Sequence, residues 1–120
     1  MAKYRLMVFT EPVEGREAEF NDWYNNQHLA DVVAVPGFSA GQRFKLVQRC
    51  EGEFKQRYLA IYEIEADDYA GAVQEMQSRA GTPAMVVSEA LDSSNVAFGV
   101  FEECSPRVAP AARSGLVPKV

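Results

Sequence analysis

Two strand-like segments with apolar side chains on both faces limit most strongly the folds open to this chain. They are KYRLMVFT (residues 3–10) and NVAFGVFEE (residues 95–103), and apolar residues occupy odd and even positions in both. A strand of this kind is covered on two sides. Helices can cover one face of a sheet, but an apolar patch of this size is rarely left in water on the other. We therefore expect the second face to pack against another copy of the chain, giving a homodimer.

Between these segments, helix-like and strand-like periodicities alternate in a recognisable order. The pattern predicts a strand (3–10), a helix from about Arg16 to the Val35-Pro36-Gly37 stop, two strands (38–50 and 54–65), a helix from Asp67 or Asp68 to Ala80, a short helix or irregular piece (82–91) and a last strand (95–103). The order β-α-β-β-α-β is the ferredoxin-like plan of the α+β class, a four-stranded antiparallel sheet with both helices on one face.

The length of 120 residues fits one domain, which we place at residues 1–104. Residues 105–120 contain proline, alanine and other small residues, and they predict a flexible tail. The chain has neither an apolar run long enough for a membrane span nor a recognisable signal peptide. Its two cysteines stand alone, without metal-ligand spacing, which is typical of reduced thiols. We therefore expect a cytoplasmic protein.

The first predicted helix places large aromatic residues on the same face as the chain's only histidine. The positions that recur at three- and four-residue steps are Phe20, Trp23, Tyr24, Gln27, His28 and Asp31. In the predicted hairpin, a turn centred on Gly52 would pair Phe44 with Ala60. Phe44 would then share the more apolar face with Tyr58 and Tyr62, and Arg43 would lie on the opposite face.

Three sequence stretches resemble the dimeric α/β-barrel superfamily, and within it the EthD-like branch. They are FNDWYNNQHLADVVAVPGF (20–38), AGQRF (40–44) and YLAIYEIE (58–65). The resemblance implies two ferredoxin-like subunits whose sheets face each other, each with a pocket between sheet and helices. Members of this superfamily include cofactor-free monooxygenases, cyclases, isomerases and heme-degrading enzymes, so it indicates the fold more closely than the chemistry. The EthD-like pattern also places a histidine where His28 stands.

His28 is the first candidate catalytic residue, because an imidazole can donate or accept a proton near neutral pH. Asp31 lies three residues further along the helix, where its carboxylate could orient the ring. The alternative is a histidine near the helix end that hydrogen-bonds a carbonyl and has no chemical task.

Rings and one cation complete the predicted site. Trp23, Tyr24, Phe44 and Tyr58 are candidates for binding a flat organic molecule, although aromatics at these spacings are also typical of a core. Tyr62, or alternatively Tyr58 or Arg43, could stabilise a developing oxyanion. Arg43 could equally form a structural salt bridge.

The composition excludes several other classes of function. A net charge of −5 is unfavourable for binding nucleic acid. No set of side chains has metal-ligand spacing, and no glycine-rich loop reads as a phosphate site. Heme could in principle bind through His28, but the close aromatic packing disfavours it. We predict neither a cofactor nor a metal.

The function predicted from these features is that of a small cofactor-independent enzyme in the catabolism of aromatic or hydrophobic compounds. Its chemistry would be proton transfer beside a carbonyl, as in an isomerase, lyase, dehydratase or cyclase, with a small hydrophobic or aromatic molecule as substrate. One alternative is a non-catalytic binding or carrier protein of the same fold. Another is a cofactor-free monooxygenase.

Overall fold

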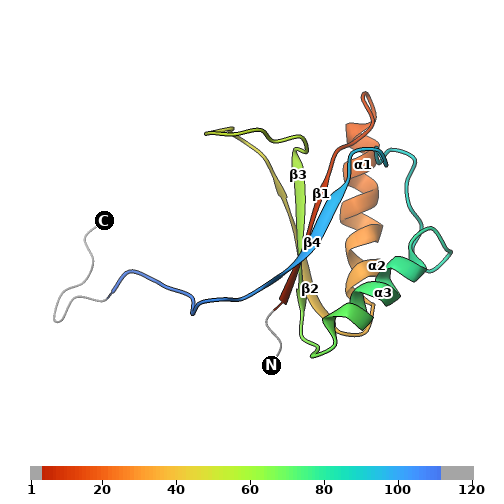
Figure 1. Cartoon of the computed structure of the whole chain (residues 1–120). Coiled ribbons are helices and arrows are strands. Elements are labelled where there is room, and N and C mark those ends of the chain that lie inside the picture. Colours follow the sequence, from red (N-terminus) through yellow and green to blue (C-terminus); the bar gives the residue numbers. More distant parts are fainter. Residues whose placement is uncertain (1–3, 112–120) are drawn as a thin grey trace.

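Four antiparallel strands form one sheet, and the helices pack on one of its faces (Figure 1). The structure is a computed structural model that describes residues 4–111. Its elements are β1 (Tyr4–Thr10), α1 (Glu17–Trp23), η1 (Tyr24–His28), α2 (Leu29–Val33), β2 (Phe38–Lys45), β3 (Tyr58–Ile64), α3 (Tyr69–Arg79) and β4 (Ala97–Glu102). The strands lie in the order β2-β3-β1-β4, which confirms the predicted ferredoxin-like fold.

The first helix contains a π-helical turn, which keeps one row of side chains on the sheet. Phe20, Tyr24, His28 and Val32 follow one another at four-residue steps. In a regular α-helix each such step overshoots a full turn by about 40°. In η1 the amide of Leu29 donates to the carbonyl of Tyr24, five residues back, and this wider turn cancels part of the overshoot.

The π turn also changes which residues face the sheet. Gln27 is exposed, so its predicted place on the inner row is wrong. Asp31 is half-buried, whereas Val32 and Val35 are each 1% exposed. The inner row therefore passes from aromatic rings, through His28, to small aliphatic side chains.

Strands β2 and β3 pair one residue out of the predicted register. Arg43, rather than Phe44, lies opposite Ala60, and Gly41 lies opposite Tyr62. Residues 46–57 form a long connection instead of a tight turn on Gly52, so turn geometry does not set the pairing. Because side chains alternate along a strand, this shift turns Arg43 toward the helices and Phe44 away from them.

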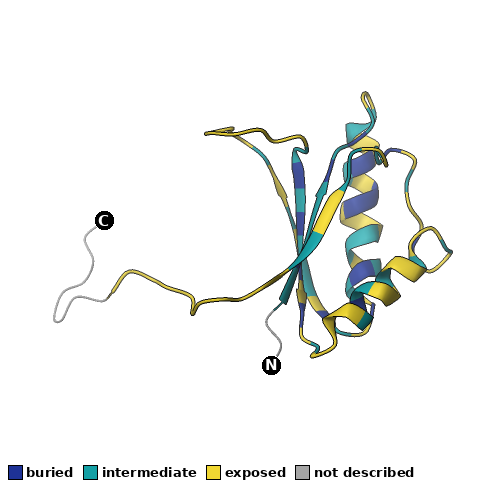
Figure 2. Ribbon diagram, in the orientation of Figure 1, coloured by how far each residue is buried: buried dark blue, intermediate teal, exposed yellow. Residues whose placement is uncertain are grey.

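The sheet face without helices is largely apolar. Its apolar side chains include Met7, Phe9, Phe44, Leu59, Ile61 and Phe101. Phe44 and Phe101 remain 44% and 56% exposed. Residues 46–57 and 103–111 extend away from the sheet on this side (Figure 1) and are exposed along most of their length (Figure 2).

Two further predictions concern segments outside the sheet. For residues 82–91 the sequence left open either a short helix or an irregular piece. These residues contain no helix and form an irregular segment on the helix side of the sheet. The predicted tail is described only as far as residue 111, and residues 112–120 lie outside the described part of the chain. None of the described helices is long and apolar enough to span a membrane.

Candidate functional site

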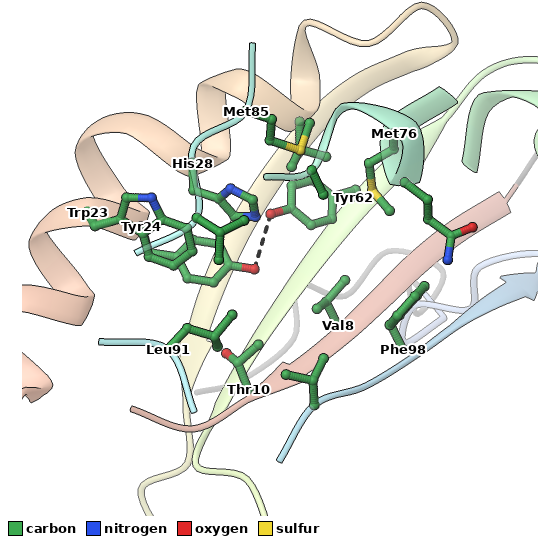
Figure 3. Close-up of a pocket in the computed structure, with 15 residues that line it drawn as sticks. Val8, Thr10, Trp23, Tyr24, His28, Tyr62, Met76, Met85, Leu91 and Phe98 are labelled. Carbon is green, nitrogen blue, oxygen red and sulfur yellow. Dashed lines mark hydrogen bonds between the residues drawn. The ribbon is translucent and has the colours of Figure 1, made fainter. Parts of the chain in front are cut away.

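A cavity of about 330 Å³ lies between the sheet and the helical layer (Figure 3). Strands β1, β3 and β4 form its floor, and η1, α3 and the irregular segment that follows α3 form its walls. The lining residues are Val8, Thr10, Trp23, Tyr24, His28, Val32, Tyr62, Met76, Gln77, Ala80, Met85, Val87, Leu91, Val96 and Phe98. Most of this lining is apolar, which is typical of a site for a small organic ligand.

His28 lines the cavity at the end of the π turn. Its ring stacks on the indole of Trp23, with centroids 4.5 Å apart and planes at 25°. The edge of Tyr24 meets the imidazole at a centroid distance of 4.9 Å. The Nδ1 atom of His28 is buried, and no described group hydrogen-bonds it. The sole histidine of the chain therefore lies in an aromatic environment with an unused polar atom.

Burial lowers the pKa of His28 to about 4, because desolvation disfavours the charged imidazolium. The carboxylate of Asp31 raises this pKa in part, and the guanidinium of Arg43 lowers it further. At neutral pH the imidazole is consequently uncharged. The predicted orienting contact is not seen, because Asp31 makes no hydrogen bond to His28 within residues 4–111 and does not line the cavity.

Two tyrosine hydroxyls lie beside the imidazole. The Tyr62 hydroxyl donates to that of Tyr24 across 3.3 Å, and Figure 3 shows His28 next to this pair. Burial raises the pKa of both tyrosines, so each remains a protonated phenol at neutral pH. Within a pair of hydroxyls one proton joins the two oxygens, which leaves the other available to a ligand.

Arg43 lies on the helix side of the sheet but outside the cavity, behind the ring of Tyr24. Its guanidinium carbon lies 4.4 Å from the Tyr24 ring centroid. Its nitrogens donate to the side-chain oxygens of Asn25 at 2.7 Å and Asn21 at 2.9 Å. The predicted salt bridge is thus replaced, among the described residues, by two amide oxygens and a ring face. Arg43 does not line the cavity, so the structure does not place it where it could contact an oxyanion there.

Two of the predicted binding residues lie elsewhere. Tyr58 is buried under α1. Its hydroxyl donates a hydrogen bond to the carboxylate of Glu17 and accepts one from the side-chain amide of Asn21 at 3.2 Å. Phe44 lies on the open face of the sheet, because the observed β2–β3 register differs from the predicted one by one residue. The cavity therefore brings together four of the predicted residues, namely His28, Trp23, Tyr24 and Tyr62.

The far wall of the cavity consists of residues that the sequence pattern did not identify as part of a site. Met85, Val87 and Leu91 come from the irregular segment. This segment is held to the rest of the fold by contacts with residues that are distant in the sequence. The indole nitrogen of Trp23 donates to the carbonyl of Val86 at 3.0 Å. Pro12 forms a β-bridge with Leu91. No periodicity marks this segment, so no local signal could have identified it.

Comparison with known proteins supports the fold. No protein-family model matches the chain. The structure resembles an EthD family protein from Bacillus halodurans, with a TM-score of 0.52 and 17% identity over 84% of this chain and 98% of that one. It also resembles the heme-degrader MhuD from Mycobacterium tuberculosis, solved with two hemes bound in its active site, with a TM-score of 0.57 and 19% identity over 88% and 99% of the two chains.

The chain shares their fold. A monooxygenase candidate from Shewanella loihica has it too, with a TM-score of 0.56 and 14% identity over 87% of this chain and 96% of that one. The fold that the predicted resemblance implies is thus confirmed.

A curated protein from Stachybotrys chlorohalonatus matches half of the chain. It is the core atranone cluster protein 1, which is 39% identical over 62 residues. This match covers 50% of the present chain and 25% of that protein, so the chain spans about a quarter of its relative's length.

The lining of the cavity does not fit heme. Heme carries two propionate carboxylates, which need cationic or hydrogen-bonding partners when they are buried. Within residues 4–111 no lysine or arginine lines the cavity, and the nearby guanidinium of Arg43 is covered by the Tyr24 ring.

Proposed function

We propose that this protein is a small cofactor-independent enzyme that moves a proton beside the carbonyl of an aromatic or hydrophobic compound. One observation carries the proposal. The only histidine of the chain lines an apolar, ring-walled cavity beside two tyrosine hydroxyls. Neighbours of the same fold include an EthD family protein and a heme-degrader, which supports an enzymatic role in the breakdown of organic compounds.

The proposed reaction follows from the state of these groups. A neutral imidazole can accept a proton from the carbon next to a bound carbonyl. The electron pair of the broken C–H bond then moves onto the carbonyl oxygen, giving an enolate. The Tyr24 hydroxyl accepts from Tyr62 and keeps its own proton free, so it can stabilise that oxygen by hydrogen bonding and compensate for the weak basicity of His28. Return of the proton to another carbon completes an isomerisation, and loss of a leaving group completes a lyase or dehydratase reaction.

A binding or carrier protein is the second candidate, and the weak basicity of His28 favours it. An imidazole with a pKa of about 4 is a poor base, and no carboxylate hydrogen-bonds it among the described residues. The apolar cavity alone would suffice to hold a hydrophobic metabolite. A cofactor-free monooxygenase would use the same cavity, and the resemblance to the Shewanella loihica protein supports that alternative.

The open sheet face supports the homodimer that the sequence predicts. It presents Phe44 and Phe101, which are roughly half exposed, together with Leu59 and Ile61. Apolar patches of this kind mark association surfaces. A second copy of the chain packed on this face would bury them, and the cavity of each subunit would remain on the helix side.

The proposal can be tested by hydrogen exchange into a neutral aromatic ketone. The probe is β-tetralone in deuterated buffer at neutral pH, with deuterium at the carbon beside the carbonyl measured by NMR. The wild-type protein should accelerate exchange, and His28→Gln should lose about a hundredfold of that rate. Gln27→Ala, next to it on the exposed side of the helix, is the matched control and should keep the full rate.

The result also separates the two candidate functions. Equal rates for the wild type and His28→Gln would end the catalytic role of His28. Binding of the ketone without any acceleration would favour the carrier protein.

A further inference from the structure

The distribution of polar atoms around the cavity indicates what kind of ligand it can take. None of the described residues that line it is Asp, Glu, Lys or Arg. The indole nitrogen of Trp23 already donates to the carbonyl of Val86. The remaining polar side chains are Thr10, Tyr24, His28, Tyr62 and Gln77.

These polar groups are not spread evenly. The hydroxyls of Tyr24 and Tyr62 lie 3.3 Å apart, and the imidazole of His28 adjoins the Tyr24 ring. They form one polar end of the cavity, at the η1 side (Figure 3). Gln77, on α3, is exposed and borders the cavity at its solvent side. Met76, Met85 and Phe98 make much of the remaining wall apolar.

A charged ligand would meet no opposite charge among the described residues that line this cavity. An ionised carboxylate or phosphate is strongly destabilised in an apolar site unless it meets an opposite charge or several donors. The guanidinium of Arg43 lies behind the Tyr24 ring and already donates to Asn21 and Asn25. The same argument applies to an ammonium group, because no carboxylate from the described part of the chain lines the cavity.

We infer that the cavity selects an uncharged carbonyl compound, holds its oxygen at the Tyr24–Tyr62 end and rejects carboxylates of the same shape. This inference rests on the proposed function, because it takes the cavity to be the ligand site. It goes beyond that function by assigning the charge and orientation of the ligand.

Two isosteric probes test the inference: acetonaphthone, a neutral methyl ketone, and naphthoate, in which a carboxylate replaces the acetyl group. Trp23 is the only tryptophan of the chain and lines the cavity, so its indole N–H gives one NMR signal that reports binding. Titration at neutral pH should show the ketone binding at least about tenfold more tightly than the carboxylate.

In the second part of the experiment, a substitution introduces a charge at the edge of the cavity. Gln77→Arg adds a cation beside the cavity and should strengthen naphthoate binding about tenfold relative to ketone binding. Gln74→Arg is the matched control, because it makes the same substitution on an exposed position of α3 that does not line the cavity. This control also accounts for the net charge of −5, which disfavours any anion.

The outcomes separate the inference from the proposed function. Equal affinity for the two probes would overturn the inference and leave the cavity as a ligand site. If Gln74→Arg strengthened naphthoate binding as much as Gln77→Arg, overall charge would account for the selectivity, and the inference would again be overturned. If neither probe moved the Trp23 signal, both the inference and the proposed function would be overturned.

Discussion

The imidazole of His28 lies against the indole of Trp23, with ring centroids 4.5 Å apart and planes at 25°. This contact removes water from one face of the imidazole, and Tyr24 meets it from another direction. Desolvation of this kind disfavours the charged form of the ring. The aromatic residues around His28 therefore determine its charge as well as its position.

The first prediction concerns the pH dependence of stability. The pKa of His28 is about 4 in the folded protein, below the value of 6.5 expected in the unfolded chain. Between these values the unfolded chain binds more protons, so the free energy of unfolding falls as the solution is acidified. From about pH 7 to about pH 5, His28 should account for a loss of about 2 kcal/mol. Urea unfolding at both pH values measures this loss.

The control for this prediction is His28→Phe, which keeps a ring but has no proton to bind. Its free energy of unfolding should change less over the same pH range, and the difference from the wild type isolates His28 from the carboxylates. NMR titration of the His28 ring signals should show neutral imidazole at pH 6, despite the opposing effect of Asp31. A midpoint near 6.5 would contradict the burial argument.

The second prediction concerns the Tyr62 hydroxyl. Tyr62→Phe removes the donor to Tyr24 and leaves a buried hydroxyl without its partner, which should cost about 1 kcal/mol of stability. It should also slow deuterium exchange into β-tetralone about tenfold, because the Tyr24 hydroxyl then loses the hydrogen bond that orients its own proton toward the enolate. Tyr69→Phe removes a tyrosine hydroxyl from a residue packed on Tyr4, outside the cavity, and should leave the rate unchanged. Unaltered exchange in Tyr62→Phe would exclude its role.

The fold could be predicted from the sequence because its signals are local. Runs of apolar residues marked the first and last strands, and the Pro36-Gly37 pair marked the end of the first helix region. The N-cap at Asp68 was among the predicted starts, and its carboxylate accepts from the amide of Gly71. Such features depend on residues a few positions apart, so they can be recognised in the sequence.

The site was predicted only in part, because its remaining features depend on long-range pairing. A shift of one residue between β2 and β3 exchanged the sides of Arg43 and Phe44. The sequence of the connection did not reveal this shift, since residues 46–57 form no tight turn. The cavity wall at Met85 and Leu91 likewise depends on contacts of an irregular segment with Trp23 and Pro12, which have no sequence period.

The third prediction concerns Gly41, a residue of β2 that lies opposite Tyr62 on β3. A Cβ atom at this position would lie 2.8 Å from the Tyr62 ring and 3.1 Å from a methyl of Val33. Gly41→Ala should therefore displace Tyr62 and reduce the free energy of unfolding by about 1–3 kcal/mol. Gly99→Ala is the matched control in β4, where the nearest atom lies at 3.9 Å. Equal stability of the two variants by urea unfolding would contradict the packing argument.

The fourth prediction concerns the open face of the sheet as a dimer surface. Phe44→Asp places a charge among apolar side chains that a second subunit would bury, so it should convert the dimer to monomer in sedimentation experiments. The variant should still fold, because Phe44 is 44% exposed in the single chain. Gln74→Asp adds the same charge to the exposed side of α3 and should leave the dimer intact. A monomeric wild-type protein, or a Phe44→Asp variant that stays dimeric, would rule out association through this face.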